Sequence, residues 1–311
     1  MFALEMVWNP SKGIDLGFFT LHYYSLMWII AFVIGLTVMK PILTKKEGES
    51  KEALDALFIY SVLGILIGAR LGHVIFYQSE LFTEDFFSVF LPFSFKDGIK
   101  FTGFAGLASH GAAIGMIIAM YLYRKKHLAH RSWLWILDRV VIPVSLGAVF
   151  VRIGNFINSE IIGKVVTDSP FGVAFVQDFY FKREIVKRTK IENIQEAYQA
   201  VTNNPKFSYL LEAVPYRHPA QLYEGFSYIF VFLILLFVYW KTNKSSQSGF
   251  IFGLFLVLLW TVRFFVEYVK ESQGGIEEYI NGVLSTGQIL SIPFILIGLY
   301  FMFVYKPKTI I

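Results

Sequence analysis

A small set of ionisable side chains lies inside or at the ends of long apolar stretches, where ordinary solvation does not explain them. A charged side chain in the middle of a membrane costs about 2.5–3.5 kcal/mol unless it is paired or hydrated, so each one is a candidate for function. Because an arginine presents a planar fork of donors that matches phosphate oxygens, these arginines predict a site for a phospholipid headgroup. The set comprises Arg70, His73, His110, Asp138, Arg139, Arg152, Glu224, Arg263 and Glu267.

Two of the arginines have polar neighbours at helical spacing. Arg152 and Asn155 lie three residues apart, and Arg263 and Glu267 lie four apart, so each pair shares one face of a helix. Such pairs can also be ion pairs that only hold helices together, and for any single residue this alternative stays open. As a set with the histidines and the other acids, they exceed what packing requires and favour a polar cavity with a binding function.

His110 lies in the run Ser109-His110-Gly111-Ala112, whose small residues let another helix or a ligand approach closely. An imidazole has an ordinary pKa of about 6.5 and suits proton transfer near neutral pH. A lone histidine on a helix is more often a packing residue, and that alternative also stays open. His110 is therefore a candidate base.

Cysteine is absent from the chain. This excludes disulfides, thiolate metal sites and a cysteine nucleophile. The histidines show no spacing typical of metal ligands, so we predict neither a metal nor a cofactor. If thiol chemistry occurs here, the substrate brings the thiol.

The composition indicates which elements position these residues. With 55% apolar and 16% charged residues among 311, the chain has too few solvating groups for a soluble domain. Apolar residues gather in stretches of about 20, the length that a helix needs to cross a bilayer. We predict an all-α polytopic membrane protein, a single domain over residues 1–311 with seven transmembrane helices. The helices cover 18–39, 53–77, 103–123, 132–151, 219–240, 249–269 and 286–305.

Basic residues are concentrated after alternate predicted spans, in 40–51, 124–131, 241–244 and 306–308. The positive-inside rule makes these segments cytoplasmic. With an odd number of spans, the N-terminus then lies outside and the C-terminus lies in the cytoplasm. The first span lacks the basic start and cleavage site of a signal peptide, so we expect it to be retained.

Two of the outside segments are long enough to carry structure. Residues 79–102 are rich in phenylalanine among a few charges, which is typical of a segment in the membrane interface that does not cross. Residues 159–217 form the predicted external head segment, inserted between the fourth and fifth spans. Within it, Ile191–Val201 has the apolar spacing of a short amphipathic helix.

The motifs together resemble one known family, the bacterial prolipoprotein diacylglyceryl transferases. The most specific match is the run from Arg152 to Gly163, with Arg, Gly-Asn-Phe, Asn, Glu and a closing Gly at the family's spacings. Further matches follow in the family's order along the whole chain. They are Tyr23-Tyr24, the run Gly68 to Gly72, Ser109-His110-Gly111, the run Arg217 to Glu224, Arg263 with Glu267, and the run Gly287 to Ser291.

The resemblance implies transfer of the diacylglyceryl group of phosphatidylglycerol to the lipobox cysteine thiol of a prolipoprotein signal peptide. This reaction forms a thioether, releases glycerol phosphate and begins bacterial lipoprotein maturation. It also implies a multi-pass protein of the bacterial cytoplasmic (inner) membrane, with its active site toward the outer leaflet and no nucleic-acid partner.

The resemblance further implies roles for individual residues. The implied catalytic residues are His110, Arg152 and Arg263. The implied substrate-binding residues are Arg152, Asn155, Glu160, Gly163, Tyr24, Arg70, Glu224 and Glu267. Among these, Asn155 and Glu160 are expected to orient Arg152 and the lipid glycerol, and Glu267 is expected to hold Arg263.

Four positions depart from the family pattern. Val151, Ala112 and Ser25 stand where glycine is usual, and Leu259 stands where many members carry a tyrosine. The first three change packing, whereas Leu259 removes a hydroxyl group.

Two other classes of protein compete with this interpretation. A retinal-binding sensor would need a lysine in its last span, and 286–305 contains none. A lipid or ion transporter is the second alternative, and that class often shows inverted repeats, which this sequence lacks.

Overall fold

The structure of the chain is a computed structural model that describes residues 4–17, 20–91, 93–96, 98–101, 106–166, 171–271 and 284–306. The chain forms two compact units, residues 1–35 with 141–311 and residues 36–140. We call the first the arginine unit, because it contains Arg152 and Arg263, and the second the histidine unit, because it contains His110. Residues 18–19 and 103–105, which begin two of the predicted spans, lie outside the described residues.

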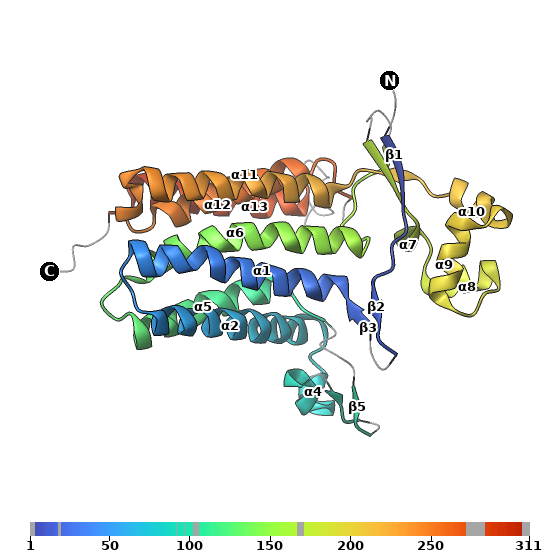
Figure 1. Ribbon diagram of the computed structural model, residues 1–311, viewed down its shortest axis with the longest axis horizontal. Coiled ribbons are helices and arrows are strands. Elements are labelled where there is room, and N and C mark those ends of the chain that lie inside the picture. The colour runs from blue at the N-terminus through green and yellow to red at the C-terminus, as the bar shows by residue number, and fades with distance from the viewer. Residues whose placement is uncertain are drawn as a thin grey trace. The chain divides into compact units, whose positions relative to one another are not determined.

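The arginine unit is built mainly from five helices. It contains the first part of α1 (Tyr23–Lys40), the larger part of α6 (Trp133–Ile157), α11 (Ala220–Lys241), α12 (Phe250–Val266) and α13 (Thr286–Leu299), which η5 (Tyr300–Val304) continues. α11 packs on α12, and α12 packs on α13 (Figure 1). α13 begins with a capping box, in which Ser285 accepts a hydrogen bond from the Gln288 backbone and the Gln288 side chain accepts one from the Ser285 backbone.

The histidine unit contains the end of α1, η1 (Pro41–Lys46), α2 (Lys51–Tyr77), α5 (Ser109–His127) and the first turns of α6. α2 and α5 lie side by side (Figure 1) and touch through glycines that leave no room for a side chain. A methyl group on Gly68 would lie 2.4 Å from the carbonyl oxygen of Gly111, and one on Gly115 would lie 2.2 Å from that of Gly64. The two backbones are therefore in direct contact.

Between α2 and α5, the chain forms only short elements. They are α3 (Leu81–Glu84), α4 (Phe86–Phe90), β4 (Phe93–Ser94) and β5 (Lys100–Phe101), with β4 antiparallel to β5. Phe86, Phe87 and Phe90 are exposed. None of the described elements of this segment is long enough to cross a bilayer, as predicted, and the exposed rings suit an interfacial position.

The predicted head segment contains both strands and helices. β6 (Phe171–Phe175) pairs in parallel with β1 (Leu4–Trp8) and antiparallel with β7 (Tyr216–Arg217). After β6 follow α7 (Val176–Phe179), α8 (Lys182–Thr189), α9 (Ile194–Asn203), η2 (Pro205–Phe207) and α10 (Ser208–Glu212). α9 is the predicted amphipathic helix, and Tyr180 and Tyr198 are buried with it in one small core.

Described helices occupy all of the predicted spans, but their lengths differ. Five are long and apolar enough to cross a membrane, counting α1 with η1 and α13 with η5, and the 17-residue α12 is shorter. α5 carries four basic residues in its last turn and is less apolar. The all-α prediction is wrong in one respect, because β1, β6 and β7 form a sheet and β2 (Gly13–Asp15) pairs with β3 (Thr20–His22).

Candidate active site

A buried ion pair joins α6 to α11 in the arginine unit. The Nε of Arg152 contacts the carboxylate of Glu224, and their side chains are 13% and 2% exposed. Arg152 Nη1 also donates to Asn155 Oδ1 at 3.3 Å, which confirms that these two residues share a helix face. The guanidinium is therefore fixed from two sides.

The chain turns after α6 around Glu160. The Glu160 carboxylate accepts hydrogen bonds from Asn155 Nδ2 at 3.3 Å and Asn158 Nδ2 at 3.1 Å, while its backbone carbonyl accepts one from Gln221 Nε2 at 2.5 Å. Ser159 and Ile161, on either side of it, have φ angles of 56° and 59°. Left-handed backbone is costly for such residues and tends to occur at functional sites. Glu160 thus links Arg152, through Asn155, to α11.

Gly163 lies at the end of the turn that contains Glu160. Its backbone N–H donates to the His218 carbonyl at 2.9 Å, and a methyl group on it would lie 2.6 Å from that oxygen and 2.7 Å from the Val269 carbonyl. Burial lowers the pKa of the adjacent His218. Only glycine fits here, between the chain that enters α11 and the chain that leaves α12.

Gly163→Ala is expected to lower the free energy of unfolding by about 1–3 kcal/mol, because the added methyl group forces backbone apart. Thermal unfolding of the purified protein in detergent measures this change. Gly147→Ala is the matched control, since a methyl group there would meet Ala31 at an ordinary 3.6 Å. Equal unfolding temperatures for both variants would contradict the assignment.

Arg263 lies in the last turn of α12. Its guanidinium carbon lies 5.3 Å from the centre of the Trp260 ring, and its Nε is buried without a hydrogen-bond partner among the described residues. The predicted pairing with Glu267 is wrong, because Glu267 pairs with Lys270 at 3.3 Å. α12 ends at Val266, so Glu267 lies in the turn that follows, close to Lys270. Arg263 therefore keeps donors for another group.

Two tyrosines border the arginines. The hydroxyl of Tyr228 lies 3.5 Å from Glu224 Oε2, and the charges of Arg152 and Arg263 both act on it. Tyr24, on α1, lies against Gly154, where a methyl group would come within 2.6 Å of its ring. Tyr24 therefore borders the helix turn that carries Arg152, and its predicted role in substrate binding stays a prediction. Tyr228 was not predicted, although its position four residues after Glu224 puts it on the same face of α11.

His110 lies in the first turn of α5 in the histidine unit. Its ring is exposed and meets Phe76 edge-on at 5.1 Å between centroids and Tyr77 at 6.3 Å. His73 stacks on the same Tyr77 at 5.3 Å. The two histidines that the sequence singled out therefore share one aromatic neighbour, and the described residues leave the ring nitrogens of His110 without a hydrogen-bond partner.

Arg70 binds backbone carbonyls. It donates to Ser88 at 2.7 Å, to Val89 at 3.1 Å and to Gly106 at 3.4 Å. Its side chain is buried, and it attaches α4 and the chain just before α5 to α2. These contacts give Arg70 a structural task, and its predicted role in substrate binding stays a prediction.

Comparison with known proteins decides the family. The model of the prolipoprotein diacylglyceryl transferase family matches residues 12–304. The chain belongs to this family. It is 37% identical to the phosphatidylglycerol–prolipoprotein diacylglyceryl transferase of Bacteroides fragilis over 98% of this chain and 97% of the relative. It is 34% identical to that of Tolumonas auensis over 96% of both chains, and 33% identical to that of Porphyromonas gingivalis over 91% and 89%.

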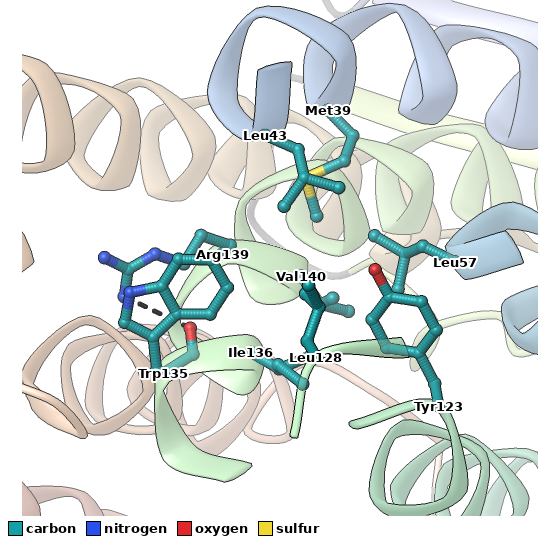
Figure 2. A pocket seen from close by; sticks show the side chains of 9 residues that line it. All are labelled: Met39, Leu43, Leu57, Tyr123, Leu128, Trp135, Ile136, Arg139 and Val140. Atoms are coloured by element: carbon teal, nitrogen blue, oxygen red, sulfur yellow. Dashed lines mark hydrogen bonds between the residues drawn. The ribbon is translucent and has the colours of Figure 1, made fainter. Parts of the chain in front are cut away.

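Figure 2 shows a small hollow in this member of the prolipoprotein diacylglyceryl transferase family. None of the predicted catalytic or substrate-binding residues lines it. It is a narrow gap between side chains of the histidine unit that is too tight to hold a water molecule, so it does not offer room for a substrate. Arg139 at its edge pairs with Glu47 at 2.9 Å and lies 4.2 Å from the centre of the Trp135 ring. For Arg139 the alternative of a structural ion pair is therefore correct. Its lining residues are Met39, Leu43, Leu57, Tyr123, Leu128, Trp135, Ile136, Arg139 and Val140.

Proposed function

We propose that this transferase moves the diacylglyceryl group of phosphatidylglycerol to the lipobox cysteine thiol of a prolipoprotein. Besides the family, the observation that carries this proposal is the pair of arginines in the arginine unit. Arg152 is mostly buried and oriented by an acid and an amide, whereas Arg263 has no hydrogen-bond or ion-pair partner among the described residues. Planar cations with free donors suit a phosphodiester.

The reaction needs charge stabilisation at the leaving group. The thiolate sulfur attacks the lipid carbon that bears the phosphodiester oxygen, so that a C–S bond forms as the C–O bond breaks. The electron pair leaves with glycerol phosphate, which thereby gains a second negative charge. The second pKa of such a phosphate monoester is about 6. Arg152 and Arg263 would stabilise that charge, and one such donor is worth about 2.7–4 kcal/mol in comparable sites.

The thiol must also lose its proton. A cysteine thiol has an ordinary pKa of about 8.5 and reacts as the thiolate. We assign removal of this proton to His110, which is exposed in the first turn of α5. The alternative is that the arginines lower the thiol pKa unaided and that His110 binds the headgroup.

The remaining predicted residues would orient these groups. Asn155 and Glu160 hold Arg152 and the turn that follows it, and Tyr24 borders the same turn. Gly163 keeps this turn against the ends of α11 and α12. Glu267, which pairs with Lys270, would support the end of α12.

Addition of labelled phosphatidylglycerol and a lipobox peptide to the purified protein tests the function. A thioether product supports the transferase. Lipid or ion flux across vesicles without product would instead favour the transporter.

We further propose that all seven helices span the bacterial inner membrane, with the N-terminus outside and the C-terminus in the cytoplasm. The support is the alternation of basic segments along the chain. The active site would then face the outer leaflet, and the head segment would lie outside.

Topology predicts which loops an impermeant maleimide reaches on intact cells. The chain has no cysteine, so single cysteines give no background. Glu192→Cys in the head segment should be labelled, whereas Ala129→Cys should be labelled only after permeabilisation, and both positions are exposed. Labelling of Ala129→Cys alone on intact cells would invert the proposed orientation.

A further inference from the structure

Three buried polar atoms near Arg152 have no hydrogen-bond partner among the described residues. They are Gln221 Oε1, Glu224 Oε1 and Ser159 Oγ. Gln221, Glu224 and Ser159 are 1%, 2% and 4% exposed. A buried acceptor without a donor costs about 1–3 kcal/mol, so native proteins rarely keep one without a reason.

These atoms belong to one place in the arginine unit. Gln221 and Glu224 lie three residues apart on α11 and so share a face. Gln221 uses its Nε2 to bind the Glu160 carbonyl, next to Ser159, and Glu224 uses its Oε2 to bind Arg152. In Gln221 and in Glu224, one polar atom of the side chain bonds to the protein, and the other, Oε1 in both, has no donor among the residues that the structure describes.

The chemistry of the three atoms describes the missing partner. Gln221 Oε1 and Glu224 Oε1 only accept, so the ligand must donate, and Ser159 Oγ can donate and accept. A headgroup hydroxyl does both. An ammonium headgroup only donates, and its charge would need an acid of its own, whereas Glu224 already pairs with Arg152.

We infer that Ser159, Gln221 and Glu224 form a subsite that recognises the hydroxyl groups of the lipid's glycerol headgroup, while the arginines bind its phosphate. This inference rests on the proposed function. It assigns headgroup selectivity to the start of α11 and the turn after α6. Arg263 Nε, which has no hydrogen-bond partner among the described residues, would bind the phosphate.

The test compares two donor lipids with identical acyl chains, phosphatidylglycerol and phosphatidylpropanol. Both release a phosphate monoester, so their intrinsic reactivities match, but only the first carries headgroup hydroxyls. The measured quantity is the ratio of kcat/KM for the two lipids in thioether formation with a lipobox peptide. The wild-type ratio should be about 100 or more, because a site built to bind a hydroxyl rejects the analogue that lacks it.

Variants show which residues set this ratio. Gln221→Met and Glu224→Gln should each lower it at least about tenfold. A purely structural role would slow both lipids equally and leave the ratio unchanged. Gln288→Met is the matched control, because Gln288 is also buried and bonded to a carbonyl, but its side-chain oxygen has the Ser285 N–H as partner. Its ratio should equal that of the wild type.

A kcat/KM ratio near one in the wild-type protein would overturn the inference. This outcome needs no variant, so the test stays decisive even if Gln221→Met does not fold. Wild-type ratios retained in both α11 variants would overturn it as well. No thioether from phosphatidylglycerol in the wild-type protein would instead refute the proposed function itself.

Discussion

Arg263→Ala is expected to lower the rate of thioether formation by about 100- to 1,000-fold, with little change in stability. The loss follows from removing one charged donor that stabilises the departing phosphate, worth about 2.7–4 kcal/mol. Arg263 has no ion pair among the described residues, and its contact with Trp260 is worth only about 0.5–1 kcal/mol. Single-turnover rates and thermal unfolding in detergent measure the two effects.

Arg263→Lys is the matched variant, because lysine keeps the charge but loses the planar fork that binds two oxygens. It should retain more activity than alanine and less than the wild type. Near wild-type transfer by Arg263→Ala would show that Arg263 only packs on Trp260, and would leave the phosphate to Arg152.

Arg152 should respond differently to the same substitution. Arg152→Ala leaves Glu224 buried without its counter-ion, and breaking such a pair costs about 3–5 kcal/mol of stability. Adding Glu224→Gln should recover folding but not transfer. A double variant with wild-type transfer would reduce Arg152 to a structural residue.

His110→Asn is expected to reduce turnover by about 100-fold or more, the lower range for loss of a general base. The side chain is exposed and has only ring contacts among the described residues, so folding should be retained. Steady-state rates at saturating peptide, with lipid binding measured separately, check this outcome.

The pH dependence separates the two roles of His110. If His110 removes the thiol proton, raising the pH toward the thiol pKa of about 8.5 should restore much of the lost rate, because the thiolate then forms without help. If His110 binds the headgroup, the deficit should stay constant with pH and lipid binding should weaken.

The sequence predicted the helices well because their signal is local. Apolar runs of bilayer length placed the spans at α2, α11, α12 and α13 with η5 within a few residues, whereas α5 and α6 continue past their predicted ends at 123 and 151. The β1–β6 pairing joins residues 4–8 to 171–175, and nothing in either short segment identifies its partner. Long-range pairing of short strands depends on tertiary packing, which a single sequence does not display.

In the candidate site, too, contacts within one helix could be predicted from the sequence, whereas contacts between elements could not. Spacing within one helix correctly brought Asn155 to Arg152, because both lie in the regular part of α6. The same reasoning failed for Arg263 and Glu267, because α12 ends between them. Contacts between helices, such as that of Glu224 with Arg152, could be found only in the structure. The same holds for the oxygens of Gln221 and Glu224 that have no donor among the described residues.

The glycine contact between α2 and α5 bears on how lipid tails travel. Their backbones touch along Gly64, Gly68, Gly111 and Gly115, so no acyl chain fits between these two helices while they stay paired. A diacylglyceryl group that enters or leaves between two helices of this protein would therefore use a different pair of helices. A methyl group at Gly68 would force α2 and α5 apart. A Gly68→Ala variant would therefore test whether close contact between these two helices controls where the acyl chains pass.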